Sequence, residues 1–216
     1  MSKTNVDKTD ANSIKFLDYI VKDSLQYDII DNAFITFTST NNIVFIVYST
    51  RNNSINFFNF LTMQKVSEIK KAHDSFIINF RYFFDKIKNR DLILSITCED
   101  SNIKIWCINS LECILNLRNI YENGGLFSAC FLNDNNKNFI ISSSYKYNIY
   151  YPIKIFNFKG EIIKELNDSK DMIFKVDSFF DQNLSKNFIF TCGYGFEKTY
   201  NFNENNLYHK YQEKDD

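Results

Sequence analysis

Apolar and polar residues alternate in short runs with a period of two along most of the chain. The clearest case is the stretch Leu92 to Leu117, LILSITCEDSNIKIWCINSLECILNL. Apolar runs at Leu92–Cys98, Ile103–Ile108 and Leu111–Leu117 are separated by short polar clusters, the first of which is Glu99–Asn102. Runs rich in β-branched and aromatic residues, joined by short polar turns, predict antiparallel hairpins. This stretch therefore predicts three consecutive strands of a meander.

The same pattern recurs along the chain. Five copies align on the strand that contains Trp106, and their large residues are 41, 48, 50 and 44 residues apart. In each of the last four copies, two further strand candidates precede this strand and a fourth follows it. Because the strand candidates follow one another in the same order in each copy, the pattern predicts a repeat protein with four strands per repeat. The large residues are, in chain order, Leu17, Phe58, Trp106, Phe156 and Tyr200.

The repeat resembles the WD repeat of β-propellers. A four-stranded unit of ~40–45 residues, with an aromatic residue followed by Asp or Asn at the end of its third strand, is typical of that family. The resemblance spans roughly residues 12 to 211 and is closest in the second repeat. There Ala72-His73 resembles the family's Gly-His, His73 precedes Trp106 by 33 residues, and Asp100 lies in the turn six residues before Trp106.

The resemblance implies structural roles for these residues. In the family a hydrogen-bonded chain links the His, a strand hydroxyl, the Asp and the Trp, so His73, Asp100 and Trp106 are expected to be buried and linked. The hydroxyl position falls on Ile96, so we expect the chain to be broken there, although Thr97 is adjacent. The family's Trp-Asp pair is replaced by Trp106-Cys107, Phe58-Asn59, Phe156-Asn157 and Tyr200-Asn201.

The predicted fold is all-β: a WD-repeat-like β-propeller of about four four-stranded blades plus an N-terminal half blade. Because family propellers commonly have seven blades, we expect an incomplete ring. A truncated or split gene product, completion by another chain, and a tight irregular closure remain alternatives. The expected order is a disordered N-terminus at 1–11, a half blade at 12–30, blades at about 31–71, 72–119, 120–168 and 169–211, and a polar tail at 212–216.

An incomplete ring would leave apolar blade faces and strand edges uncovered. We therefore expect the chain to self-associate, to bind a chain that supplies the missing blades, or to aggregate. Other proteins are the expected partners in any of these cases.

Composition narrows the choice of partner and compartment. The 25 basic and 26 acidic side chains give a net charge of −1, which provides no electrostatic reason to expect nucleic acid or a membrane surface. No apolar run approaches the ~18 residues of a membrane span. The polar start, MSKTNVDKTDANS, has no apolar secretory segment. We expect a cytoplasmic protein, with the nucleus as the alternative.

Candidate chemistry is sparse. The five cysteines form no C-x-x-C pair, so buried reduced thiols are expected in place of a metal site. Neither His73 nor His209 has a nucleophile or carboxylate pattern beside it, and no cofactor motif is present, so we expect no catalytic, cofactor-binding or metal-binding residues. The basic cluster Lys86, Lys88 and Arg90 is typical of a solvated loop.

A non-catalytic protein–protein interaction scaffold, holding partners in a multiprotein assembly, is the preferred function. The alternatives are a propeller enzyme or ligand-binding module that uses the central channel, and an RNA-associated propeller. The aromatic and basic stretch Tyr145–Tyr151, YKYNIYY, is the feature that would suit base stacking.

Overall fold

The computed structural model describes residues 33–122, 124–145, 149–167, 172–194, 196–204 and 207–212. The chain divides into two compact units, Met1–Ile77 and Ile78–Asp216. Each unit is described by itself below. The half blade expected at 12–30 and the N-terminus at 1–11 lie outside the described residues, so these two expectations stay predictions.

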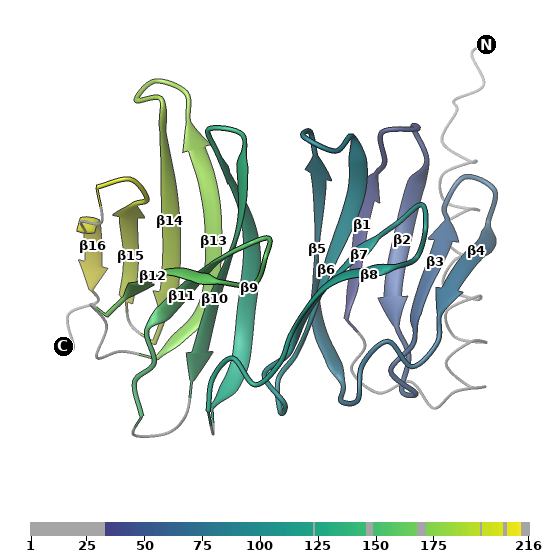
Figure 1. Cartoon of the computed structure of the whole chain (residues 1–216), viewed down its shortest axis with the longest axis horizontal. Coiled ribbons are helices and arrows are strands. Elements are labelled where there is room, and N and C mark those ends of the chain that lie inside the picture. The colour runs from purple at the N-terminus through teal and green to yellow at the C-terminus, as the bar shows by residue number, and fades with distance from the viewer. Residues whose placement is uncertain are drawn as a thin grey trace, which may run out of the picture. The chain divides into compact units, whose positions relative to one another are not determined.

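The described residues of the first unit form one four-stranded antiparallel sheet, blade 1, with its strands in chain order (Figure 1). Ile46, Tyr48 and Phe58 are buried together on one of its faces, with Phe60 and Met63 packed against them. Its strands are β1 (Phe34–Thr38), β2 (Val44–Ser49), β3 (Ile55–Asn59) and β4 (Gln64–Ile69).

The second unit contains three more four-stranded antiparallel sheets, each again a meander in chain order (Figure 1). Blade 2 is β5–β8, blade 3 is β9–β12 and blade 4 is β13–β16. Blade 2 consists of β5 (Ile77–Asp85), β6 (Arg90–Thr97), β7 (Ile103–Cys107) and β8 (Cys113–Leu117). Blade 3 consists of β9 (Gly125–Asp134), β10 (Lys137–Tyr145), β11 (Ile153–Asn157) and β12 (Ile162–Leu166). Blade 4 consists of β13 (Ile173–Asp181), β14 (Lys186–Gly193), β15 (Phe196–Asn201) and β16 (Leu207–Gln212).

All four sheets share one register. In each, the large residue of the third strand pairs with an isoleucine of the second strand, and the pairing of the third and fourth strands slips at that same residue. A bulge at a fixed place in every repeat indicates one repeated structural unit. The pairs are Phe58 with Ile46, Trp106 with Ile93, Phe156 with Ile140 and Tyr200 with Ile189, and all four large residues are buried.

The cores of the second unit lie between its sheets. Blades 2 and 3 bury one apolar cluster, to which Leu94 and Ile105 contribute from blade 2 and Ile140 and Phe156 from blade 3. Blades 3 and 4 bury a second cluster. Blade 3 is therefore covered on both faces, and for this reason its strands are apolar on both sides. The second cluster includes Ile141, Ile153, Ile155, Val176, Ile189 and Tyr200.

The prediction of an all-β, propeller-like fold built from four-stranded antiparallel sheets is confirmed. The meander order follows from the short turns, since neighbouring strands of a blade are joined by two to seven residues and pair with each other. The closure of the ring stays a prediction.

Candidate interaction site

The repeat positions of blade 2 hold a turn in place. The indole Nε1 of Trp106 donates a hydrogen bond of 2.8 Å to Ser95 Oγ, and the Trp106 side chain is buried. Asp100 accepts hydrogen bonds from the Thr97 hydroxyl and, at 2.7 Å, from Asn102 Nδ2. Both carboxylate oxygens therefore stabilise the turn between β6 and β7.

The expectation that Ile96 removes the hydroxyl next to Trp106 is wrong. Side chains alternate along a strand, and Trp106 is paired with Ile93, so its neighbour on the same face of β6 is two residues further on, at Ser95. Ile96 points to the opposite face, where it is fully buried. The register of β6 against β7, rather than a count from the turn, identifies the hydroxyl.

His73 is buried, and its backbone N–H donates to the carbonyl of Asn53 at 3.4 Å. It belongs to the first compact unit, whereas Asp100 belongs to the second. The predicted contact between the two side chains therefore stays a prediction.

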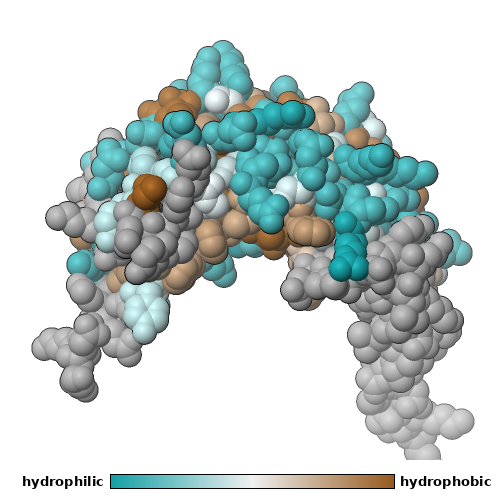
Figure 2. Space-filling model, turned by 90° about the horizontal axis from the view of Figure 1, so that it is seen from below, coloured by the Kyte–Doolittle hydropathy of each residue, from teal (hydrophilic) through white to brown (hydrophobic). Residues whose placement is uncertain are grey.

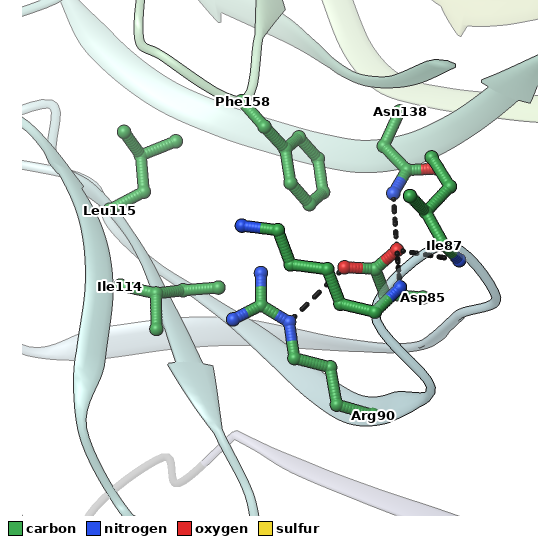
Figure 3. A pocket seen from close by; sticks show the side chains of 8 residues that line it. Asp85, Ile87, Arg90, Ile114, Leu115, Asn138 and Phe158 are labelled. Atoms are coloured by element: carbon green, nitrogen blue, oxygen red, sulfur yellow. Dashed lines mark hydrogen bonds and ion pairs between the residues drawn. The ribbon is translucent and has the colours of Figure 1, made fainter. Parts of the chain in front are cut away.

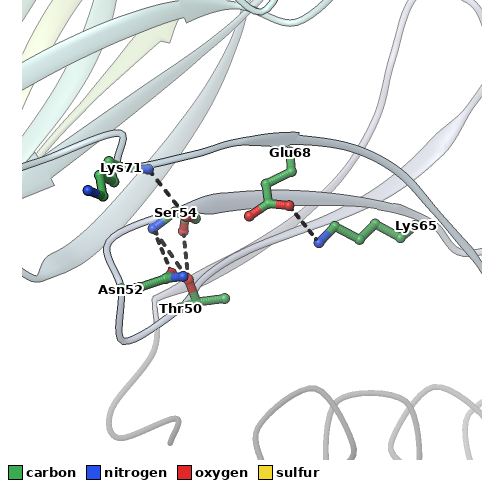
Figure 4. A network of polar contacts seen from close by, with 6 residues as sticks. All are labelled: Thr50, Asn52, Ser54, Lys65, Glu68 and Lys71. Atoms are coloured by element: carbon green, nitrogen blue, oxygen red, sulfur yellow. Dashed lines mark hydrogen bonds and ion pairs between the residues drawn. The ribbon is translucent and has the colours of Figure 1, made fainter. Parts of the chain in front are cut away.

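Blade 1 stabilises its equivalent turn with a related set of contacts. The Thr50 hydroxyl is hydrogen-bonded to Asn52 Oδ1, and Ser54 N donates to Thr50 Oγ1 at 3.3 Å (Figure 4). Ser54 Oγ in turn accepts from the backbone N–H of Lys71 at 3.3 Å. The turn includes Asn53 at a φ of 60°, a conformation that asparagine tolerates better than most residues. These polar side chains hold the backbone of the turn in place.

A pocket of about 420 Å³ lies where blades 2 and 3 meet (Figure 3). Asp85 at the end of β5 and Arg90 at the start of β6 lie on one side, with Asn138 of β10 above them in the view. Apolar side chains from β8 and from the residue directly after β11 form the remaining wall. The lining residues are Asp85, Ile87, Lys88, Arg90, Ile114, Leu115, Asn138 and Phe158.

Asp85 is the structural centre of this pocket. Its side chain is buried, and Oδ1 accepts hydrogen bonds from the backbone N–H of Ile87 at 3.2 Å and of Lys88 at 3.4 Å. Oδ1 also accepts from Asn138 Nδ2 at 2.9 Å, while Oδ2 pairs with Arg90 Nε at 3.1 Å. A buried carboxylate requires this many partners. Asp85 thus fixes its own loop, the start of β6 and the neighbouring blade together.

The pocket combines positive charge with apolar surface. Lys88 and Arg90 against the one carboxylate of Asp85 leave a net charge of +1 among the lining residues. Arg90 uses Nε for Asp85, and within the described part of the chain its other guanidinium N–H groups bond to no further side chain. Phe158 is held by Phe83 and Phe131, with ring centroids 6.4 and 6.0 Å away. This arrangement suits a short peptide segment with a carboxylate beside an apolar side chain.

The sequence predicts a solvated loop for Lys86, Lys88 and Arg90. For Arg90 the prediction is incomplete, because its side chain forms an ion pair with the buried Asp85. Asp85 and Asn138 are 53 residues apart, and Phe158 is 20 residues further on. No local pattern joins them. The signal that could have found them is the repeat itself, which places the end of one first strand beside the second strand of the next repeat.

A second pocket, of about 660 Å³, occupies the corresponding place between blades 3 and 4. Asp134 again accepts from an asparagine of the next sheet, with 2.7 Å between Asp134 Oδ1 and Asn187 Nδ2. The lining is mostly amide and hydroxyl groups. Lys86 is its one cationic side chain. It is therefore less suited than the first pocket to an acidic, partly apolar ligand.

Candidate catalytic groups do not gather in the described residues. Within those ranges no three His, Cys, Asp or Glu side chains lie close enough to hold a metal ion. His209 is exposed on β16, and all five cysteines are free. Burial, followed by the charge of Asp177, raises the pKa of the Cys130 thiol far above its usual range, which makes it a poor nucleophile. Over the same ranges, no helix has the length and apolar character needed to cross a membrane.

The stretch proposed for base stacking is only partly described. Tyr150 is exposed, whereas the Tyr151 hydroxyl donates to the carbonyl of Glu122 at 2.6 Å. The surface seen in Figure 2 is mainly hydrophilic, with apolar residues in small separate groups.

Comparison with known proteins shows the fold and no family. No family model matches the sequence, and no curated protein matches it. Among solved structures, the chain is similar to BBS1N in its crystal structure in complex with ARL6DN, with a TM-score of 0.62 and 12% sequence identity. The match covers 86% of this chain, which spans 58% of the BBS1N chain. The similarity supports a propeller-like fold for this chain, and WD-repeat membership stays a prediction.

Proposed function

We propose that this chain is a non-catalytic protein–protein interaction scaffold of the WD-repeat type that holds partners in a multiprotein assembly. The observation that carries the proposal is the pocket between blades 2 and 3, where Lys88 and Arg90 face an apolar wall made of Ile114, Leu115 and Phe158. Rigid sheets fix the walls of this pocket, while its charged residues lie on or next to a loop. The structural neighbour BBS1N was crystallised with another protein, which is consistent with such a role.

The partner segment that suits this pocket is acidic and partly apolar. A carboxylate would accept hydrogen bonds from Arg90 and Lys88, and an apolar side chain would lie against Phe158. Charge-assisted hydrogen bonds at a partly desolvated site are about twice as strong as neutral ones. We place the assembly in the cytoplasm or nucleus, because five free cysteines suit a reducing compartment.

Affinity purification of the tagged full chain from its own cells tests the proposal. Lys88→Glu reverses an exposed charge at the pocket, and Lys159→Glu reverses an exposed charge that does not line it. We expect stoichiometric partner proteins with the unmodified chain and with Lys159→Glu, and loss of at least one of them with Lys88→Glu. Purification without a stoichiometric partner, or turnover of a small substrate by the purified chain alone, would contradict the proposal.

A further inference from the structure

Both junctions of the second unit contain the same polar contact. At each, the aspartate that ends the first strand of one blade accepts a hydrogen bond from an asparagine in the second strand of the next blade. The distances are 2.9 Å from Asn138 Nδ2 to Asp85 Oδ1 and 2.7 Å from Asn187 Nδ2 to Asp134 Oδ1. The asparagine is the second residue of β10 in one case and of β14 in the other. The contact is therefore a repeated element of blade-to-blade packing.

An aromatic residue accompanies the asparagine at both junctions. Directly after the third strand, blade 3 places Phe158 against Phe83 of blade 2, and blade 4 places Phe202 against Phe139 of blade 3. The ring centroids are 6.4 and 5.2 Å apart. Blades 3 and 4 thus each meet the preceding blade of the second unit with an amide and an aromatic ring.

Blade 4 also has an aspartate, Asp181, at the position that accepts the hydrogen bond in the two junctions. Asp181 ends β13 and pairs with Lys186 as Asp134 pairs with Lys137. Its Oδ1 accepts from the backbone N–H of Asn183 at 2.8 Å and of Leu184 at 3.0 Å, the same loop contacts that Asp85 makes. Within the described residues, Oδ2 of Asp181 receives no hydrogen bond, and no following sheet supplies an amide.

Apolar surface lies next to this carboxylate. Phe179 is 46% exposed and Tyr208 60% exposed, and their ring centroids lie 5.3 and 4.9 Å from that of Phe188, which is itself buried. We call Phe179, Asp181 and Tyr208 the terminal face. In blade 3 the position equivalent to Phe179 is Leu132, which is buried in the cluster shared with blade 4.

We propose that the terminal face binds a four-stranded antiparallel sheet of a second polypeptide, which presents an asparagine amide to Asp181 and an aromatic ring to Phe179, as Asn138 and Phe158 meet Asp85 and Phe83. The repeat supplies the reason, because the two internal junctions join the same groups in the same order. This inference concerns a surface separate from the pocket of the proposed function, and each can fail without the other.

A further copy of this chain fits the terminal face poorly. In blade 1 the position equivalent to Asn138 and Asn187 is Val44, as the pairing of β2 with β3 shows. A valine would cover Asp181 without donating a hydrogen bond, and a desolvated carboxylate without a donor is costly. The occupant is therefore a sheet with an amide at this place.

A chain extended at its C-terminus by a copy of residues 169–216 tests this chemistry, because that copy carries both Asn187 and Phe202. The readout is the alkylation rate of Cys192, which lies on the same side of β14 as Phe188; the appended copy carries Cys192→Ser so that one such thiol remains. We expect the appended sheet to slow alkylation of Cys192 about tenfold or more. Asn187→Val in the appended copy alone should restore most of the original rate, because a lost buried hydrogen bond costs about a factor of five to a hundred.

Cys130, buried between blades 3 and 4, reports in the same samples that the original chain remains folded. An unchanged rate at Cys192 in the extended chain, or equal protection with the Asn187→Val copy, would overturn the proposal. A photo-crosslinker at Phe179 of the full chain in its own cells tests the source of the sheet. A crosslink mapped by mass spectrometry to an asparagine-bearing strand of another protein supports the proposal, and one mapped to this chain itself refutes it.

Discussion

One face of blade 3 and the equivalent face of blade 4 share a register and differ in chemistry. On blade 3, Ile153 and Ile155 of β11 are fully buried against blade 4. The pairing of β14 with β15 puts Glu197 and Thr199 at the same positions on blade 4, where they are exposed and half-buried. Strand pairing fixes where a side chain points, whereas the covering neighbour determines whether it must be apolar.

The difference is confined to part of the face. Close to the loop that carries Asp181, blade 4 keeps large aromatic residues, of which Phe179 is 46% exposed. Further along the sheet it carries a carboxylate and a hydroxyl. An exposed aromatic group beside a polar region is the pattern of a docking surface rather than of an interior face.

The faces of blades 3 and 4 that point toward the preceding blade are both covered. Substitutions on these two faces should therefore lower stability alike, and they should give the largest losses. Phe156 and Tyr200 occupy the same register position, and both are buried against the preceding blade. Alanine at either position should lower the free energy of unfolding by about 3–5 kcal/mol, because each leaves a large cavity. Denaturant unfolding measures this, with Tyr194→Ala, at an 88% exposed site, as the control that should change little. A loss at Tyr200 of less than about 1 kcal/mol would show that blade 4 is not packed on blade 3 as described.

Substitutions on the two faces that differ in chemistry should change stability by clearly different amounts. We expect Ile155→Ala to cost about 2–5 kcal/mol, whereas Thr199→Ala should stay within about 0.5 kcal/mol. Both changes remove side-chain atoms at one register position, so the difference measures what a covering blade contributes. Equal losses in equilibrium unfolding would mean that the face of blade 4 is also covered.

Asp85 and Asp181, which end the first strands of blades 2 and 4, should differ less in their contribution to stability. Asp85→Asn replaces the oxygen that accepts from Arg90 and removes the negative charge, but it keeps an oxygen for the loop and for Asn138, so we expect a loss of about 1–3 kcal/mol. Asp181→Asn likewise keeps the oxygen that accepts from Asn183 and Leu184, and it should change stability by less than about 0.5 kcal/mol. Thermal unfolding of the two variants side by side is the measurement. A large loss from Asp181→Asn would reveal a partner for this carboxylate that the described residues do not provide.

Much of the architecture could be predicted from the sequence, because it depends on local patterns. Alternation around Trp106 and its counterparts predicts strands, and short polar turns join neighbours. A count from the turn places Ile96 beside Trp106, whereas the structure places the hydroxyl of Ser95 there. A count of this kind does not consider which face of the sheet a strand residue occupies. The pocket could not be predicted: Asp85, Asn138 and Phe158 meet only when two sheets pack. The equivalence of Val44 with Asn138, and of Asp181 with Asp85, can be recognised only when the register of all four sheets is known.

The most direct test of the contrast between the two faces compares two native cysteines of the unmodified chain. Cys130 lies on the covered side of blade 3 and is 2% exposed, whereas Cys192 lies on the terminal side of blade 4 and is partly exposed. Burial also raises the pKa of the Cys130 thiol, so little reactive thiolate forms near pH 8. Alkylation followed cysteine by cysteine with mass spectrometry should show Cys192 reacting at least about a hundred times faster, with Cys130 modified only as the chain unfolds. Equal, slow modification of both thiols would contradict the account, because it would mean that the face of blade 4 is as covered as that of blade 3.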